Sequence, residues 1–203
     1  MQPNDTYKTI VEATEEQLFK EKNSKFLGYA YPISSDDEVK PLLFSLRKQH
    51  PNAVHFCYAY QVGAEQIYYR ANDDGEPSGS AGIPIYGQIQ SFGITNVLLV
   101  IVRYFGGVKL GVGGLISAYK TAAQQTLESA SLIEKTIDVS YVARFDYAQL
   151  NKVMRVIKEK NLVILSQKMD MHCEIELSTR KSAEANLLAA FENLYEIVLK
   201  KKS

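Results

Sequence analysis

The distribution of glycine divides this chain of 203 residues into parts with different backbone requirements. Ten of its twelve glycines lie between Gly75 and Gly114, no glycine follows Gly114, and no proline follows Pro84. Glycine adopts backbone angles that other residues avoid, and it allows a second backbone to come close. We therefore expect tight turns or close approaches in the middle of the chain, and regular helices and strands in its last third.

The sequence up to about residue 127 has the apolar patterns of alternating strands and helices. Apolar residues at i, i+3, i+4 and i+7 predict a helix that contains Val39, Leu42, Leu43 and Leu46. The apolar stretch 96–104 predicts a strand buried on both faces. The other expected elements are strands at 17–21, 25–31, 54–62 and 66–70, a short helix at 82–92, a glycine loop at 105–114 and a helix that continues to about residue 127.

The composition changes near residues 134–137, where we place a boundary between domains 1–135 and 136–203. The second domain is predicted to contain, in order, strand 137–145, a helix, strands 162–168 and 172–177, a second helix and strand 197–199. This β-α-β-β-α-β order predicts a ferredoxin-like unit, and the whole chain is expected to be α+β. The terminal lysines, Lys200 to Lys202, are expected on a frayed end.

Charge and cysteine content limit the classes of protein that fit. The 23 basic and 23 acidic residues cancel, so bulk charge neither favours nor excludes nucleic acid as a partner. The two cysteines, Cys57 and Cys173, form no disulfide framework and are expected as free thiols in a reducing compartment. Residues 1–12 lack a signal-peptide pattern, and the longest apolar run, 97–102, is too short to span a membrane. We expect a cytoplasmic protein that does not bind membranes.

The first candidate site is an acidic turn that begins at residue 73. Its carboxylates, Asp73, Asp74 and Glu76, could bind a hard cation such as Mg²⁺ through oxygen ligands, although their spacing does not match an EF-hand. A tight turn in which Ser78 or Ser80 caps the next helix explains the same residues. We favour the tight turn, and we therefore predict no metal site at these carboxylates.

The second candidate is the loop that follows the predicted buried strand. Residues 106–114 contain five glycines and Lys109. Backbone N–H groups can converge in such a loop, and the helix that follows offers unpaired N–H groups at the positive end of its dipole. The predicted site for an anion or nucleic acid consists of Arg103, Gly106, Gly107, Lys109, Gly111, Gly113, Gly114 and Lys120.

The residues around this loop carry no negative charge. Residues 77–127 contain no Asp or Glu, and their only charges are Arg103, Lys109 and Lys120. A buried core would also exclude charge, but it would not by itself explain the glycine loop. A Walker A motif would need Gly-Lys-Ser/Thr where the chain has Gly-Val-Gly at 111–113, and Ile116 replaces the third glycine of GxGxxG. Neither a P-loop nor a dinucleotide fingerprint is predicted.

A third candidate is the pair His55 and Cys57, which share one face of a predicted strand. They could ligate a metal or act as nucleophile and base. Further ligands are missing, because His172 and Cys173 lie in the other domain. We favour a packed thiol beside a polar histidine. If the acidic turn or the glycine loop forms a binding site, we expect His55, Ser78 and Ser80 to line it.

Three of these segments, in this order, resemble motifs of the YigZ/IMPACT family, and the C-terminal domain is similar to the small domain of bacterial members. Two positions depart from the family pattern. Ser80 stands where threonine is frequent, and Ser117 stands where arginine is frequent, which removes one cation near the loop. The motifs are Ala53-Val54-His55-Phe56-Cys57-Tyr58-Ala59-Tyr60, Asp73-Asp74-Gly75-Glu76-Pro77-Ser78-Gly79-Ser80-Ala81-Gly82 and Arg103-Tyr104-Phe105-Gly106-Gly107-Val108-Lys109-Leu110-Gly111-Val112-Gly113-Gly114-Leu115.

The resemblance implies an N-terminal domain similar to domain 2 of ribosomal protein S5 and a C-terminal domain similar to a ferredoxin-like domain of elongation factor G. Eukaryotic members regulate translation by competing for the activator of a kinase that phosphorylates an initiation factor. For the bacterial type, the resemblance implies a cytoplasmic protein linked to translation or nucleic acid, with no established reaction.

Three hypotheses about function follow. The one we favour is a non-catalytic binding protein in the regulation of translation, whose glycine loop contacts phosphates of RNA, for example on the ribosome. The second is a phosphate- or nucleotide-dependent enzyme in which Lys109 contacts phosphate and Asp73, Asp74 or Glu76 holds Mg²⁺, by analogy with small-molecule kinases of the S5-like fold. The third is an adaptor that binds a protein partner and needs its glycines only for folding. Only the enzyme hypothesis requires a cofactor.

Overall fold

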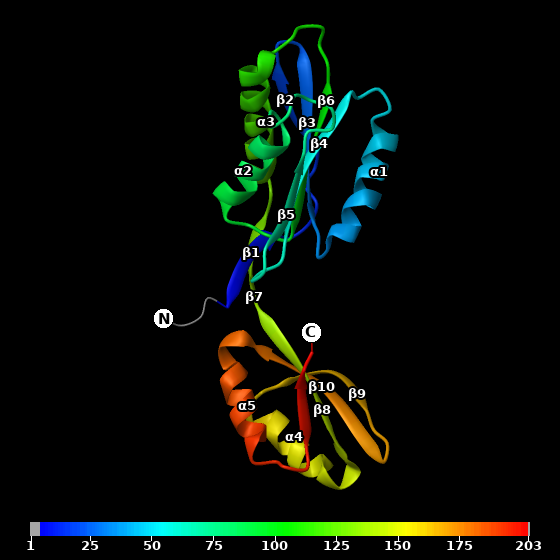
Figure 1. Ribbon diagram of the computed structural model, residues 1–203, viewed down its shortest axis with the longest axis vertical. Coiled ribbons are helices and arrows are strands. Elements are labelled where there is room, and N and C mark those ends of the chain that lie inside the picture. The colour runs from blue at the N-terminus through cyan, green and yellow to red at the C-terminus, as the bar shows by residue number, and fades with distance from the viewer. Residues whose placement is uncertain (1–4, 203) are drawn as a thin grey trace. The chain divides into compact units, whose positions relative to one another are not determined.

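The computed structural model describes residues 5–202, which divide into two compact α+β units (Figure 1). The larger unit comprises residues 7–135, and the smaller one comprises residues 136–202 together with residues 5 and 6. Residue 5 belongs to the smaller unit because the Asp5 carbonyl accepts the Ile137 N–H and the Asp5 carboxylate accepts two hydrogen bonds from Arg180.

A five-stranded antiparallel sheet forms the centre of the larger unit, with the strand order β2-β3-β6-β4-β5. The central strand is buried along almost its whole length, as its continuous apolar run predicts. Lys22 and Asn23 have positive φ and turn the chain between the first two strands. The strands are β2 (Gln17–Glu21), β3 (Ser24–Pro32), β4 (His55–Val62), β5 (Tyr68–Asn72) and β6 (Val97–Tyr104).

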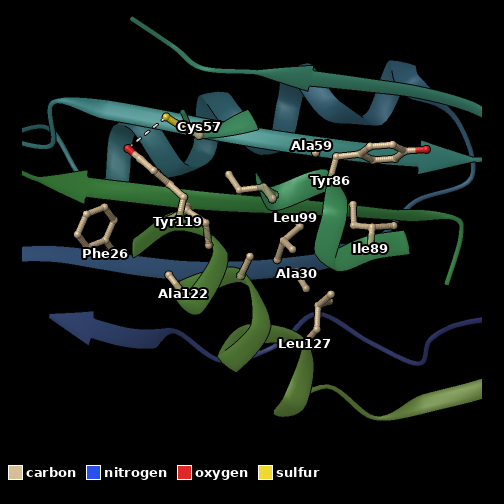
Figure 2. Packing of buried hydrophobic residues seen from close by; sticks show 14 of the residues in the cluster. Phe26, Ala30, Cys57, Ala59, Tyr86, Ile89, Leu99, Tyr119, Ala122 and Leu127 are labelled. Atoms are coloured by element: carbon tan, nitrogen blue, oxygen red, sulfur yellow. Dashed lines mark hydrogen bonds between the residues drawn. The ribbon is translucent and has the colours of Figure 1, made fainter. Parts of the chain in front are cut away.

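Helices cover both faces of this sheet (Figure 1). On one face, α2 (Gly82–Phe92) and α3 (Gly111–Glu128) pack over a core that includes Phe26, Leu99 and Tyr119 (Figure 2). On the other face lies α1 (Val39–Gln49), which buries Val39 and Leu46. Full burial of one such aliphatic side chain stabilises a fold by roughly 1.5–3 kcal/mol.

Several boundaries differ from those that the sequence predicts. The helix α3 begins at Gly111, so the last part of the predicted glycine loop is the first turn of this helix. The strand β5 begins at Tyr68, two residues later than expected. A two-stranded sheet of β1 (Thr6–Ile10) and β7 (Leu132–Thr136) was not expected, because these short strands show no clear alternation.

The smaller unit has the predicted β-α-β-β-α-β order of elements. Its antiparallel sheet has the strand order β11-β8-β10-β9, and Val153, Val156 and Ile157 form the buried side of the first helix. Its elements are β8 (Asp138–Asp146), α4 (Leu150–Glu159), β9 (Val163–Lys168), β10 (His172–Arg180), α5 (Glu184–Glu192) and β11 (Val198–Lys201), and 3-10 helices at Asp36–Glu38, Tyr147–Gln149 and Lys181–Ala183 precede α1, α4 and α5.

The terminal lysines are ordered, so the expectation of a frayed end was wrong. Strand β11 pairs with β8 as far as Lys201, whose Nζ lies 2.6 Å from Glu184. Lys202 forms an ion pair with Glu176 at 2.8 Å. Between residues 5 and 202, no helix has both the length and the apolarity that crossing a bilayer requires.

Candidate functional site

The first carboxylate of the acidic turn holds the turn and the start of α2 together. Asp73 accepts hydrogen bonds from the backbone N–H groups of Gly79 at 2.8 Å, Ala81 at 3.0 Å and Gly82 at 2.8 Å. Asp73 thus satisfies N–H groups at the helix start that have no partner within the helix. The capping residue expected from the sequence was Ser78 or Ser80, but Ser78 is exposed and the Ser80 hydroxyl donates to the Pro77 carbonyl.

The second carboxylate fixes the turn to neighbouring elements. Asp74 accepts the Phe56 N–H at 2.6 Å and the Arg47 guanidinium of α1 at 2.7 Å. Its carbonyl oxygen lies 2.8 Å from His55 Nδ1. The tight turn that the sequence analysis favoured is therefore what the structure contains.

The third carboxylate forms a buried ion pair with a residue predicted to bind anions. Glu76 Oε1 lies 2.6 Å from Arg103 Nη1, and the two side chains are only 4% and 6% exposed. The Tyr119 hydroxyl donates to the same carboxylate oxygen at 2.8 Å. Arg103 is thus neutralised inside the fold, and its assignment to an exposed anion site is corrected. This pair joins the acidic turn to the end of strand β6, directly before the glycine loop.

His55 and Cys57 adjoin the same buried network, and Figure 2 shows the contact between Cys57 and Tyr119. His55 Nε2 lies 3.8 Å from Glu76, and Cys57 Sγ lies 3.0 Å from the Asp73 carbonyl oxygen and 3.3 Å from the Tyr119 hydroxyl. Burial raises the pKa of the Cys57 thiol and of the Tyr119 hydroxyl, so both stay protonated at neutral pH. The thiol is therefore packed rather than reactive.

No metal centre emerges from these groups. Among the residues that the structure describes, no three or more His, Cys, Asp or Glu side chains form a group that could hold a metal ion. The three carboxylates of the acidic turn contact three different sets of partners, and this explains why proximity in sequence does not produce a ligand set here.

The glycines of the loop differ in what the fold requires of them. A Cβ atom on Gly106 would lie 2.1 Å from the Asn23 backbone, so only glycine fits there. Gly107 and Gly111 have φ values of +84° and +71°, which favour glycine. Gly114 is close to Leu110, with 3.2 Å between its virtual Cβ and that side chain. Gly113 needs neither special angles nor space, because a Cβ there would contact nothing within 4 Å.

The loop and the first turn of α3 form an exposed surface, which we call the glycine-loop surface (residues 105–113). Lys109 is exposed, and so are Phe105, Val108 and Val112. The first turn of α3 contains no acidic residue, and no side chain caps this end of the helix. The surface therefore combines one cation with the positive end of a helix dipole.

Lys120 lies apart from this surface. It is nine residues from Gly111 along α3, which corresponds to about 13 Å at 1.5 Å per residue. Lys120 instead lines a groove of about 680 Å³ between α2 and α3, together with Gly79, Ile83, Gly87, Gln88 and Ile116. The sequence analysis missed this groove and the role of Tyr119, because both depend on how the two helices pack.

Comparisons with known proteins agree with the motifs. Residues 22–127 match the Impact N-terminal domain. A Bacillus subtilis protein, IMPACT family member YvyE, is 35% identical over 159 residues, which cover 78% of this chain and 73% of the relative. Protein IMPACT of Rattus norvegicus is 31% identical over 96 residues, which cover 45% of this chain and 30% of that protein.

A solved structure supports the fold as well. The crystal structure of a hypothetical protein is 25% identical, covers 98% of each chain and has a TM-score of 0.74. The domain match contains the acidic turn, the buried Glu76–Arg103 pair and the glycine-loop surface. The resemblance inferred from the three motifs is thereby confirmed, and this chain belongs to the IMPACT family.

Proposed function

We propose that this chain is a non-catalytic binding protein in the regulation of translation, which contacts RNA phosphates through the glycine-loop surface. The observation that carries the proposal is the start of α3, which is exposed, uncapped by any side chain and adjacent to Lys109. The link to translation rests on the family resemblance, since eukaryotic members regulate translation. The proposed partner is RNA, for example on the ribosome.

The chemistry of the surface suits a phosphate. Backbone N–H groups in the first helical turn can donate to phosphate oxygens, and the helix dipole contributes about 0.3–1 kcal/mol at an exposed site. Lys109 adds a formal charge, and the half-exposed Phe105 ring offers a flat face on which a base can stack. Affinity that comes from phosphate contacts falls steeply as salt rises.

The acidic turn supports binding rather than catalysis. Each of its carboxylates already has strong partners within the fold, whereas an enzyme that uses Mg²⁺ would need them directed at the metal and the substrate. The similarity to domain 2 of ribosomal protein S5 and to a domain of elongation factor G remains part of the proposal. A cytoplasmic location is also part of the proposal, because free thiols such as Cys57 and Cys173 are typical of a reducing compartment.

The test is fluorescence anisotropy of a labelled structured RNA with the full chain. We expect binding that weakens with salt and with Lys109→Ala, and that is unchanged by Lys40→Ala on the exposed side of α1. Binding that is indifferent to both salt and Lys109 would refute the proposal. Complete absence of binding at low salt would favour the enzyme or the adaptor hypothesis.

A further inference from the structure

The groove between α2 and α3 has features that the proposed contact with RNA at the glycine-loop surface does not explain. Its lining mixes aliphatic residues with glycines and polar side chains, and Ile83 and Ile116 remain 57% and 39% exposed. Exposed aliphatic side chains that line a concave surface are typical of a site that another molecule covers.

Gly87 is a glycine that the fold does not require. It lies within α2, its φ is not positive, and a Cβ there would meet nothing within 4 Å. Glycine inside a helix is less stable than alanine, so this position carries a cost without a benefit to the folded chain. The residue lines the groove, where the missing side chain leaves room for another backbone to approach.

Gln88 adds a polar group to the groove lining. Its side chain lines the groove and is 7% exposed, yet within residues 5–202 it makes no hydrogen bond. The carboxamide atoms are not among the fully buried polar atoms that lack a partner, so they remain accessible from the groove. A carboxamide has both a donor and an acceptor, so it can pair with a peptide group of a bound segment.

The charge of the groove selects among possible ligands. Lys120 is the one charged residue that lines it, and residues 77–127 contain no Asp or Glu. Phe92 is the one aromatic residue of the lining, whereas unpaired RNA bases are usually held by stacking on several aromatic or arginine side chains. The lining therefore matches an acidic, partly aliphatic ligand better than a nucleic acid.

We propose that the α2–α3 groove binds a peptide segment of a partner protein in which an acidic side chain stands next to aliphatic ones. The acidic side chain pairs with Lys120, and the aliphatic side chains cover Ile83 and Ile116. The peptide backbone passes over Gly87 and hydrogen-bonds the Gln88 carboxamide. This site is separate from the glycine-loop surface, so it can be tested even if RNA does not bind.

The experiment begins with a displayed library of short random peptides, selected on the full chain and counter-selected on Gly87→Leu. Enriched peptides are synthesised with a fluorescent label and titrated by anisotropy. We expect an acidic residue beside aliphatic ones, and a loss of affinity of about tenfold or more with Gly87→Leu and with Lys120→Glu. Lys40→Glu on α1 is the matched control for the charge change and should leave binding unaltered.

Two further measurements keep the result interpretable. Circular dichroism should show Gly87→Leu unfolding at no lower temperature than the parent chain, because leucine favours helix more than glycine does and a Cβ at this position meets nothing within 4 Å. Replacing the acidic residue of the peptide by lysine should restore binding to Lys120→Glu, which tests the contact without relying on Gly87. Peptides that bind equally to all variants, enrichment without acidic residues, or single-stranded RNA that competes for the groove would overturn the proposal.

Discussion

Replacing Arg103 by methionine tests whether this residue serves the fold or a ligand. The substitution removes the guanidinium and keeps an unbranched side chain of similar length. Arg103 is 5% exposed and pairs with Glu76 at 2.6 Å, so the variant leaves a buried carboxylate without its counter-charge. The hydrogen bond from Tyr119 to Glu76, at 2.8 Å, can persist.

The expected loss of stability follows from these contacts. Breaking a buried ion pair by removing one partner costs roughly 3–5 kcal/mol. The remaining hydrogen bond from Tyr119 offsets about 1 kcal/mol of this cost, so we expect a loss of about 2–4 kcal/mol. For a domain with the size of the larger unit, this lowers Tm by about 8–16 °C.

Circular dichroism of the full chain during thermal and denaturant unfolding measures this change. Arg47→Met is the matched control, because Arg47 pairs with Asp74 at a half-exposed position and should cost about 1 kcal/mol or less. The double variant Arg103→Met with Glu76→Gln should lose less than the sum of the single variants. A stable Arg103→Met variant that no longer binds RNA would refute this reasoning and return Arg103 to the anion site.

Three other predictions concern single positions. Gly106→Ala should lower the free energy of unfolding by about 1–3 kcal/mol, because its Cβ meets a neighbouring backbone. Gly113→Ala should raise the free energy of unfolding by up to about 1 kcal/mol in the same assay. Equal effects of the two substitutions would contradict this distinction. Hydrogen bonds from Arg180 lower the pKa of Asp5 from 3.8 to about 2, so its contribution to stability is complete above pH 3.8 and is lost as pH falls through 2. Acid titration of Asp5→Asn should therefore show a weaker dependence on pH in that window, and an unchanged dependence would be inconsistent with the ion pair. Burial raises the pKa of Cys57, so its alkylation by iodoacetamide at neutral pH should be slow until the chain unfolds, and rapid labelling of the folded chain would argue against a packed thiol.

The sequence predicts the elements whose signals are local. The spacing of Val39 and Leu46 identifies α1, and the continuous apolar run 97–102 identifies the buried centre of β6. Both signals depend on residues within a few turns or pleats of each other. The boundary of α3 was harder to predict, because five glycines suggest a loop although Gly113 lies within a helical turn.

The site could be predicted only in part, because its key contacts join distant residues. Arg103 and Glu76 are 27 residues apart, and each was assigned from its own neighbours to a different kind of site. Tyr119 was not assigned to any site, although its hydroxyl reaches Glu76 across 43 positions. Which charges face each other is decided by how the acidic turn packs against β6 and α1, and this packing is not visible in the sequence.

The central claim is that the start of α3 binds phosphate groups of RNA. An NMR titration of the ¹⁵N-labelled full chain with a structured RNA tests it most directly, because it reports on each backbone N–H group. The account predicts that the largest shifts occur at the amides of residues 107–113, and that Lys109→Ala reduces them. Shifts that centre on the smaller unit or on α1, with residues 107–113 unaffected, would contradict it.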